Sequence, residues 1–255
     1  MNAPPDSQAG APSPLPLTGE RTVPGVAEEN YWFQRHVAAY RFAASRCQGL
    51  RVLDAGAGEG YGTAMLAETA AEAVGVELVD DVVAHARHAY PRLKFIQADL
   101  CEMPLPHASF DAVVSLQVIE HLPDIGRYLA EIERVLRPGG EFICATPNRL
   151  TFTPDSDTPV NPFHVIEFSP DELSDLLGRR FRVKAVLGLH HARRVRAVER
   201  LARRPFTDLV LDRPPEQWPR WLRRAVRAVR PDDFRLRADA LDDSLDLVAI
   251  VARHR

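Results

Sequence analysis

Cysteine is scarce in this sequence, and its few copies are scattered. The 255 residues contain three, Cys47, Cys101 and Cys144, and none stands in a Cys-x-x-Cys pair. An odd, dispersed set argues against a disulfide framework and against a zinc site built from thiolates. We therefore expect neither, and take the cytoplasm as the default compartment.

Long apolar runs and an excess of one charge are also missing. No run reaches the roughly 18 apolar residues of a membrane span, and the first residues lack the basic start and apolar stretch of a secretory signal. Lys+Arg (32) nearly balances Asp+Glu (35), so the net charge is -3. We expect no membrane span and no general attraction to nucleic acid or to an anionic membrane. Residues 1–18 are rich in proline and are expected to be a disordered tail ahead of one domain, 19–255.

Short apolar segments alternate with helical patterns through most of the chain. Strands are expected at 51–55, 73–77, 93–97, 110–115, 141–145, 181–189 and 244–252, and helices at 27–47, 63–73, 79–90, 125–136 and from the Ser169 cap onward. Arg137-Pro-Gly-Gly140 is interpreted as the stop signal and capping glycine of helix 125–136. This alternation predicts an α/β, Rossmann-like, doubly wound fold. Its sheet is mainly parallel and seven-stranded, with an N-terminal helical arm and an insertion before the last strand.

The insertion differs in composition from the rest of the chain. Residues 191–237 carry 14 arginines against six acidic residues. We predict a helical insertion over 191–240. Two interpretations stay open: a solvated helix face, or an anion-attracting lid over the active site.

A glycine-rich turn follows the first expected strand, in Asp54-Ala-Gly56-Ala-Gly58-Glu-Gly60-Tyr-Gly62. It does not fit the dinucleotide pattern G-x-G-x-x-G, and Asp54 would repel a pyrophosphate. Asp54 suits an ammonium group, Glu77 at the second strand end suits a ribose diol, and Asp99 at the third suits an adenine amino group. Together these three acids predict S-adenosylmethionine (SAM) as the cofactor.

These motifs, with Phe110-Asp111, Glu120-His121 and Leu136–Gly140, resemble the successive motifs of class I SAM-dependent methyltransferases over about residues 50–145. A narrower resemblance rests on 17–24, 29–33, 117–122, 146–149, 157–159, 161–164 and 242–247. These segments are similar to actinobacterial methyltransferases linked to methylglucose lipopolysaccharide synthesis, which implies O-methylation of a sugar. The predicted cofactor-binding residues are Asp54, Gly56, Gly58, Gly60, Glu77, Asp99, Leu100 and Gln117.

A sugar hydroxyl is a poor nucleophile, so a general base is expected beside the methyl group. His121, after the fourth strand, is one candidate and His164, in Asn161-Pro-Phe-His164, is the other; for each, a purely structural role stays open. Glu120 either orients His121 or caps a helix. Four other histidines are expected at the surface or on the lid, namely His85, His88, His190 and His191.

Other features leave alternatives open. Asp155, Asp157 and His164 offer ligands for Mg²⁺ but form no recognisable motif, so no metal is predicted. The cluster Tyr31-Trp32-Phe33 either packs in the core or closes the pocket. The expected partner is a small-molecule or glycan acceptor, with a homodimer left open. A quinone, lipid or other metabolite as acceptor, or an inert SAM-binding regulator, are the alternatives.

Overall fold

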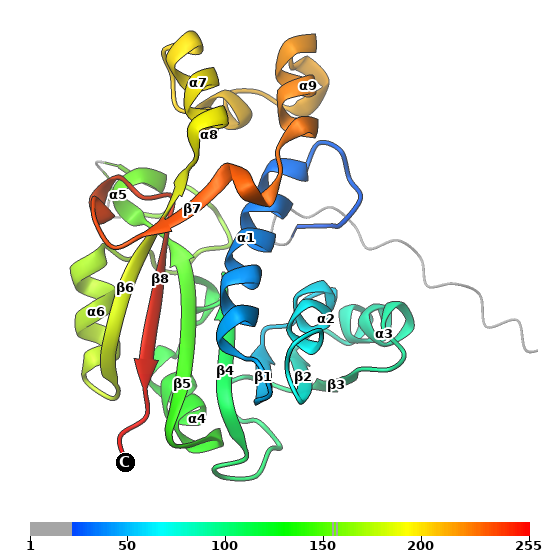
Figure 1. Cartoon of the computed structure of the whole chain (residues 1–255), viewed down its shortest axis with the longest axis vertical. Coiled ribbons are helices and arrows are strands. Elements are labelled where there is room, and N and C mark those ends of the chain that lie inside the picture. The colour runs from blue at the N-terminus through cyan, green and yellow to red at the C-terminus, as the bar shows by residue number, and fades with distance from the viewer. Residues whose placement is uncertain (1–21, 155, 157) are drawn as a thin grey trace, which may run out of the picture.

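The computed structural model describes residues 22–154, 156 and 158–255. The predicted tail, 1–18, and the candidate ligands Asp155 and Asp157 lie outside the described residues. Within them, a single sheet lies between layers of helices, and a further group of helices lies beyond one end of the sheet (Figure 1). No helix of this part of the chain is both long and apolar enough to cross a membrane.

The sheet is mixed and, over the described residues, has eight strands in the order β3-β2-β1-β4-β5-β8-β6-β7. The strands are β1 (Arg51–Ala55), β2 (Glu72–Glu77), β3 (Lys94–Gln97), β4 (Phe110–Leu116), β5 (Leu136–Pro147), β6 (Arg182–His191), β7 (Phe234–Arg237) and β8 (Asp246–Ala252). Pairings among β1 to β5 are parallel, and β8 pairs antiparallel with both β5 and β6. The prediction of a doubly wound sheet is confirmed, but its count of seven strands is wrong.

The strand that sequence analysis missed is β7. Its four residues, Phe-Arg-Leu-Arg, lie at the end of the arginine-rich segment and pair antiparallel with β6. Phe234 is buried and Arg235 is exposed. So short an alternation, inside a segment dominated by helical patterns, gives too weak a signal to be recognised without its partner strand.

Helices cover both faces of the sheet. The helices of the described residues are α1 (Asn30–Arg46), α2 (Tyr61–Ala67), α3 (Asp80–Ala89), α4 (Ile125–Val135), α5 (Arg149–Phe152), α6 (Pro170–Gly178), α7 (Arg193–Ala202), α8 (Phe206–Leu211) and α9 (Arg220–Ala228), of which α7 to α9 lie beyond the end of the sheet. On one face, Tyr40 of α1 and Leu66 of α2 pack against the sheet, and on the other, Ile132 of α4 and Leu173 of α6 do so. These two apolar layers fix the strands whose carboxyl ends form the site.

Local signals set two of the helix ends. α6 begins with the expected capping box, in which the Ser169 hydroxyl and the Glu172 carboxylate accept from each other's backbone N–H. The expected glycine cap of α4 is wrong. The helix ends at Val135, and Leu136 is already extended, fully buried and paired with Phe110 at the start of β5. Gly139, with φ +78°, therefore lies within β5 and caps no helix.

The predicted insertion is largely helical and has a small core of its own. Helices α7, α8 and α9 gather beyond the end of the sheet, near the start of α1 (Figure 1). Buried side chains of this segment, among them Phe206 of α8, Trp218 between α8 and α9, and Val226 of α9, pack with Tyr31 of α1 and Phe234 of β7. The segment is therefore more than a solvated helix face; its role as a lid stays a prediction.

Candidate functional site

The glycine turn occupies the carboxyl end of β1 and needs its glycines. Gly56 has φ +87°, and a Cβ there would lie 2.4 Å from Cγ2 of Val118. Gly60, with φ +88°, precedes α2, and a Cβ there would lie 2.8 Å from the Phe95 ring. Any larger residue at either position would force the turn away from its neighbours. The turn thus brings bare backbone to the sheet edge.

Asp54 lies beneath this turn, fully buried. Its carboxylate accepts hydrogen bonds from the Tyr40 hydroxyl (3.1 Å) and the Thr63 hydroxyl (2.7 Å). Burial raises the pKa of Asp54 to about 7, although both hydroxyls lower it. The side chain is therefore fixed below the turn, and its contact with a cofactor ammonium stays a prediction.

The other predicted cofactor residues lie along the same sheet edge, because β3, β2, β1 and β4 are neighbours. The Glu77 carboxylate accepts from the backbone N–H of Gly58 at 3.1 Å and so connects the end of β2 to the glycine turn. Asp99 is exposed, two residues beyond β3. Leu100 is 6% exposed and belongs to the core, so its side chain faces the interior. The structure brings these residues together at one edge; their contacts with SAM stay predictions.

A cavity of about 520 Å³ opens next to this edge, and we name it the His121 cavity. Its walls come from the ends of β4 and β5, from α1 and from the loop before α6. They are Thr22, Glu29, Trp32, Arg35, His36, Gln117, Glu120, His121, Pro147, Phe152, Val160, Asn161, Pro162, Phe163, His164 and Leu211. All three residues predicted to be catalytic therefore line one cavity, although His164 is far from the other two in sequence.

Gln117 belongs both to the predicted cofactor residues and to the cavity wall. Its φ of +58° is unusual for a residue other than glycine, and such strain is common at functional sites. Its backbone N–H donates to Ala145 O at 2.8 Å, and its side-chain amide donates to Asp246 at 3.1 Å. These bonds hold the strained residue where the two predicted sites meet.

Glu120 is fully buried in the cavity wall. Its Oε2 accepts from the Thr146 hydroxyl of β5 at 3.0 Å. Burial raises the pKa of Glu120 to about 8, against the smaller effect of hydrogen bonds to its backbone and to Thr146. The side chain thus connects the turn after β4 to β5, a role that neither sequence interpretation included.

The two candidate bases lie side by side, with ring centroids 4.9 Å apart. His121 Nδ1 is 2.9 Å from the Phe163 carbonyl, and His164 Nδ1 is 2.7 Å from Glu167 Oε1. Since a carbonyl and a carboxylate can only accept, these contacts favour a proton on each Nδ1 and a lone pair on each Nε2. Glu167, 4% exposed, was not recognised as a site residue; its position three residues after His164 was the available signal.

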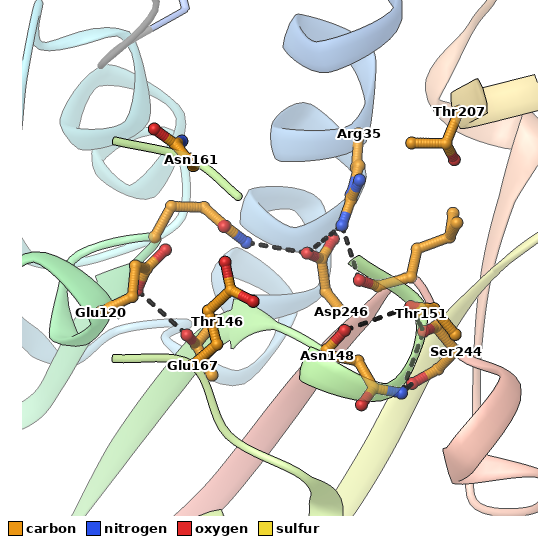
Figure 2. A network of polar contacts seen from close by, with 12 residues as sticks. Arg35, Glu120, Thr146, Asn148, Thr151, Asn161, Glu167, Thr207, Ser244 and Asp246 are labelled. Atoms are coloured by element: carbon orange, nitrogen blue, oxygen red, sulfur yellow. Dashed lines mark hydrogen bonds and ion pairs between the residues drawn. The ribbon is translucent and has the colours of Figure 1, made fainter. Parts of the chain in front are cut away.

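A buried ion pair closes the wall of the cavity on the α1 side. The Arg35 guanidinium binds the Asp246 carboxylate and also donates to Leu245 O at 2.6 Å (Figure 2). The two side chains are 4% and 2% exposed. Sequence analysis missed this pair, because Arg35 and Asp246 lie in helix and strand patterns more than 200 residues apart.

The aromatic cluster of α1 was expected either to pack in the core or to close the pocket, and its three members have different surroundings. Tyr31 is fully buried in the core of the α7–α9 group, Trp32 lines the His121 cavity, and Phe33 packs edge-on against Tyr61. His191 was expected at the surface or on the lid, and of these two places only the surface is excluded. His191 is 9% exposed, because its ring lies between the Tyr31 hydroxyl (2.8 Å) and the Glu199 carboxylate (2.9 Å).

Comparison with known proteins gives methyltransferases at the level of the domain, the whole sequence and the fold. Residues 53–144 match the family model of a methyltransferase domain. A Mycolicibacterium smegmatis protein named "Probable S-adenosylmethionine-dependent methyltransferase" is 47% identical over 97% of this chain and 99% of its own. A Mycobacterium tuberculosis protein with a similar name is 44% identical over 98% and 94%. A solved SAM-dependent methyltransferase from Thermotoga maritima shares the fold, with a TM-score of 0.60 at 19% identity over 89% of this chain and 96% of that one.

Proposed function

Because the chain belongs to the S-adenosylmethionine-dependent methyltransferases and takes SAM as cofactor, we propose that it methylates a hydroxyl oxygen. The acceptor in this proposal is a sugar or a polysaccharide precursor bound in the His121 cavity. The observation that carries it is the convergence of His121, His164 and buried Glu120 in one cavity beside Gln117. A nitrogen acceptor already has a reactive lone pair, whereas a hydroxyl needs a group that takes its proton.

The transfer is a single displacement. A lone pair of the acceptor oxygen attacks the methyl carbon, the carbon–sulfur bond breaks, and its electron pair neutralises the sulfonium. The products are a methyl ether and S-adenosylhomocysteine, and the hydroxyl proton passes to Nε2 of His121. In this proposal His121 is the base, oriented by Phe163 O, and His164 is the alternative, oriented by Glu167.

The protein supplies position as well as a base. Trp32 and Phe152 give the cavity apolar walls that limit the access of water, while Gln117 lies where the cavity meets the predicted cofactor edge. Burial raises the pKa of Glu120 to about 8, so part of the Glu120 population is protonated, and therefore neutral, near pH 7. A neutral Glu120 leaves less negative charge beside an incoming nucleophile.

A second cavity supports an acceptor longer than one ring. It has about 600 Å³ and shares Arg35 and Phe152 with the His121 cavity. Its other walls include charged side chains such as Arg237 and Asp243. A polyhydroxylated chain can hydrogen-bond to such walls along its length. The resemblance to methyltransferases linked to methylglucose lipopolysaccharide synthesis supports the same acceptor class.

An apolar acceptor is the second candidate, favoured by one observation. Val160 (70% exposed) and Phe163 (40% exposed) lie at the cavity wall and would suit a lipid or a quinone. The deciding experiment offers methyl-labelled SAM with partially methylated oligosaccharides, quinone precursors and fatty acids in parallel. Transfer to oligosaccharides alone supports the proposal, and transfer to a quinone or fatty acid alone contradicts it. SAM binding without transfer to any acceptor would favour an inert regulator.

A further inference from the structure

Three potential metal ligands meet in the wall of the His121 cavity. Glu120, His121 and His164 each offer one ligand atom, and these atoms lie within 4.8 Å of one another. Glu120 and His121 follow β4, whereas His164 lies in the loop between α5 and α6. The backbone carbonyl of Glu120 accepts from Val165 N at 2.7 Å, which fixes the loop against the turn.

The Glu120 carboxylate has one oxygen that the protein does not satisfy. Oε2 accepts from Thr146, but among the described residues no donor reaches Oε1, although the side chain is fully buried. A buried acceptor without a partner is costly and is rare in native proteins. A bound cation would supply the missing partner.

Both histidines have the outer contacts that metal-binding histidines usually have. His121 Nδ1 contacts the Phe163 carbonyl, and His164 Nδ1 contacts the buried Glu167 carboxylate. Such partners fix the ring and leave Nε2 as the ligand atom. The Asn161 amide donates to His164 Nε2 at 3.0 Å, so an ion would have to displace this amide.

We propose that Glu120, His121 and His164 bind a divalent transition metal ion, with Zn²⁺ as the model, in the wall of the His121 cavity. Two imidazole nitrogens and one carboxylate suit Zn²⁺, whereas Mg²⁺ prefers a set of oxygens. Zinc ligands at about 2.0–2.2 Å from the ion lie roughly 3.3 Å from one another. Small side-chain rotations must therefore bring the three ligand atoms, which lie within 4.8 Å of one another, closer together. Three protein ligands leave a coordination position for a substrate oxygen.

The use of this ion in catalysis rests on the proposed function, but its binding does not. With the acceptor hydroxyl on the open position, the ion makes its proton more acidic, and the proton can pass to water. The histidines are then ligands and no longer the base. The methyl group still moves from sulfur to oxygen, and the products are unchanged.

The test measures metal binding in the absence of SAM and acceptor. The chain is freed of metal by chelator dialysis and titrated with Zn²⁺, Co²⁺ and Mg²⁺ by calorimetry, and the Co²⁺ form is examined by visible absorption. One Zn²⁺ per chain should bind, more tightly than Mg²⁺, and Co²⁺ should give the intense visible bands of low-coordinate, nitrogen-ligated cobalt. Glu120→Gln and His164→Gln should each weaken Zn²⁺ binding at least 10-fold, and Glu167→Gln by ~10–100-fold. His88→Gln, an exposed histidine on α3, should leave it unchanged.

Two results would overturn the site: no saturable Zn²⁺ binding by the intact chain, or wild-type affinity in both Glu120→Gln and His164→Gln. SAM titration of each variant checks that the variant is folded. The Co²⁺ spectrum of the unaltered chain tests the site even if a variant does not fold. If Zn²⁺ binds but no hydroxyl acceptor is methylated, the site stands and the proposed function fails. If the metal-free chain methylates as fast as the Zn²⁺ form, the ion has no catalytic role and His121 remains the base.

Discussion

Arg35 of α1 and Asp246 of β8 form a buried ion pair whose carboxylate also accepts a hydrogen bond from Gln117. The pair connects α1 to β8 (Figure 2), and through the Gln117 amide it also connects both to the strained residue that follows β4. Its removal should affect stability and the shape of the His121 cavity together.

The first prediction concerns this pair. Asp246→Asn should lower the free energy of unfolding by about 3–5 kcal/mol, because it leaves the Arg35 charge buried without a counter-ion. Urea unfolding measures the loss. The matched control is Asp232→Asn, which removes the acid of the exposed Arg41–Asp232 pair and should cost less than about 1 kcal/mol. Equal losses in the two variants would contradict the role assigned to the buried pair.

The second prediction concerns the cofactor. Glu77→Ala should weaken SAM binding by ~1–3 kcal/mol, because the carboxylate holds the Gly58 amide and is expected to accept the ribose hydroxyls. Calorimetric titration with SAM measures it. Glu72→Ala, at the opposite end of the same strand, is the control and should bind normally. Unchanged affinity in a Glu77→Ala/Asp54→Ala double variant would refute the assignment of this edge to SAM.

The third prediction concerns acceptor activation. His121→Ala should lower kcat by ~10²–10⁴-fold while SAM affinity stays nearly unchanged, because the hydroxyl loses the group that prepares it for attack. Steady-state kinetics on the acceptor found in the methyl-transfer assay measure it. A full kcat in His121→Ala combined with a lost kcat in His164→Ala would reverse the two roles. Full activity in both variants would show that neither histidine alone is needed in this step.

The fourth prediction concerns acid stability. Burial lowers the pKa of His36 to about 4, although nearby Asp246 raises it and Arg35 adds a further lowering effect. The unfolded chain then takes up a proton below about pH 6.5 and the folded chain only below about 4, so stability falls as the pH falls through this interval. Between pH 8 and 5.5, the wild type should lose about 1 kcal/mol more unfolding free energy than His36→Gln does.

Urea unfolding at the two pH values measures this difference, and the comparison of variants cancels the titration of other groups. His88→Gln, with an exposed ring, should follow the wild type. Parallel losses in the wild type and His36→Gln would show that His36 is not held neutral.

The fifth prediction concerns the α7–α9 group. Leu211 at the end of α8 lines the His121 cavity although it is 56% exposed. If the group covers the acceptor, Leu211→Asp should raise the acceptor KM several-fold and leave SAM affinity unchanged. Leu201→Asp, on α7 and 86% exposed, lies away from the cavity and serves as the control. The same KM in both variants would argue against a lid.

Local sequence chemistry was enough to predict the doubly wound sheet and the cofactor edge. The alternation of apolar strands and helices needs only neighbouring residues to be recognised, and so does the turn at Gly56 to Gly60, where larger side chains would clash. Parallel strands bring their carboxyl ends to one edge, so Asp54, Glu77 and Asp99 could be grouped from the order of their strands alone.

Long-range contacts decided the rest. Whether a polar side chain is buried, and against what, depends on elements that meet only in the folded chain, as with Arg35 and Asp246 or His191 and Tyr31. For the same reason β7 could not be recognised without β6. The sequence by itself was enough to predict SAM as the cofactor, and it predicts the glycine turn after β1 as the place where SAM binds. Only the tertiary structure brought Glu120, His121 and His164 together, because a loop before α6 has to fold back onto the turn after β4.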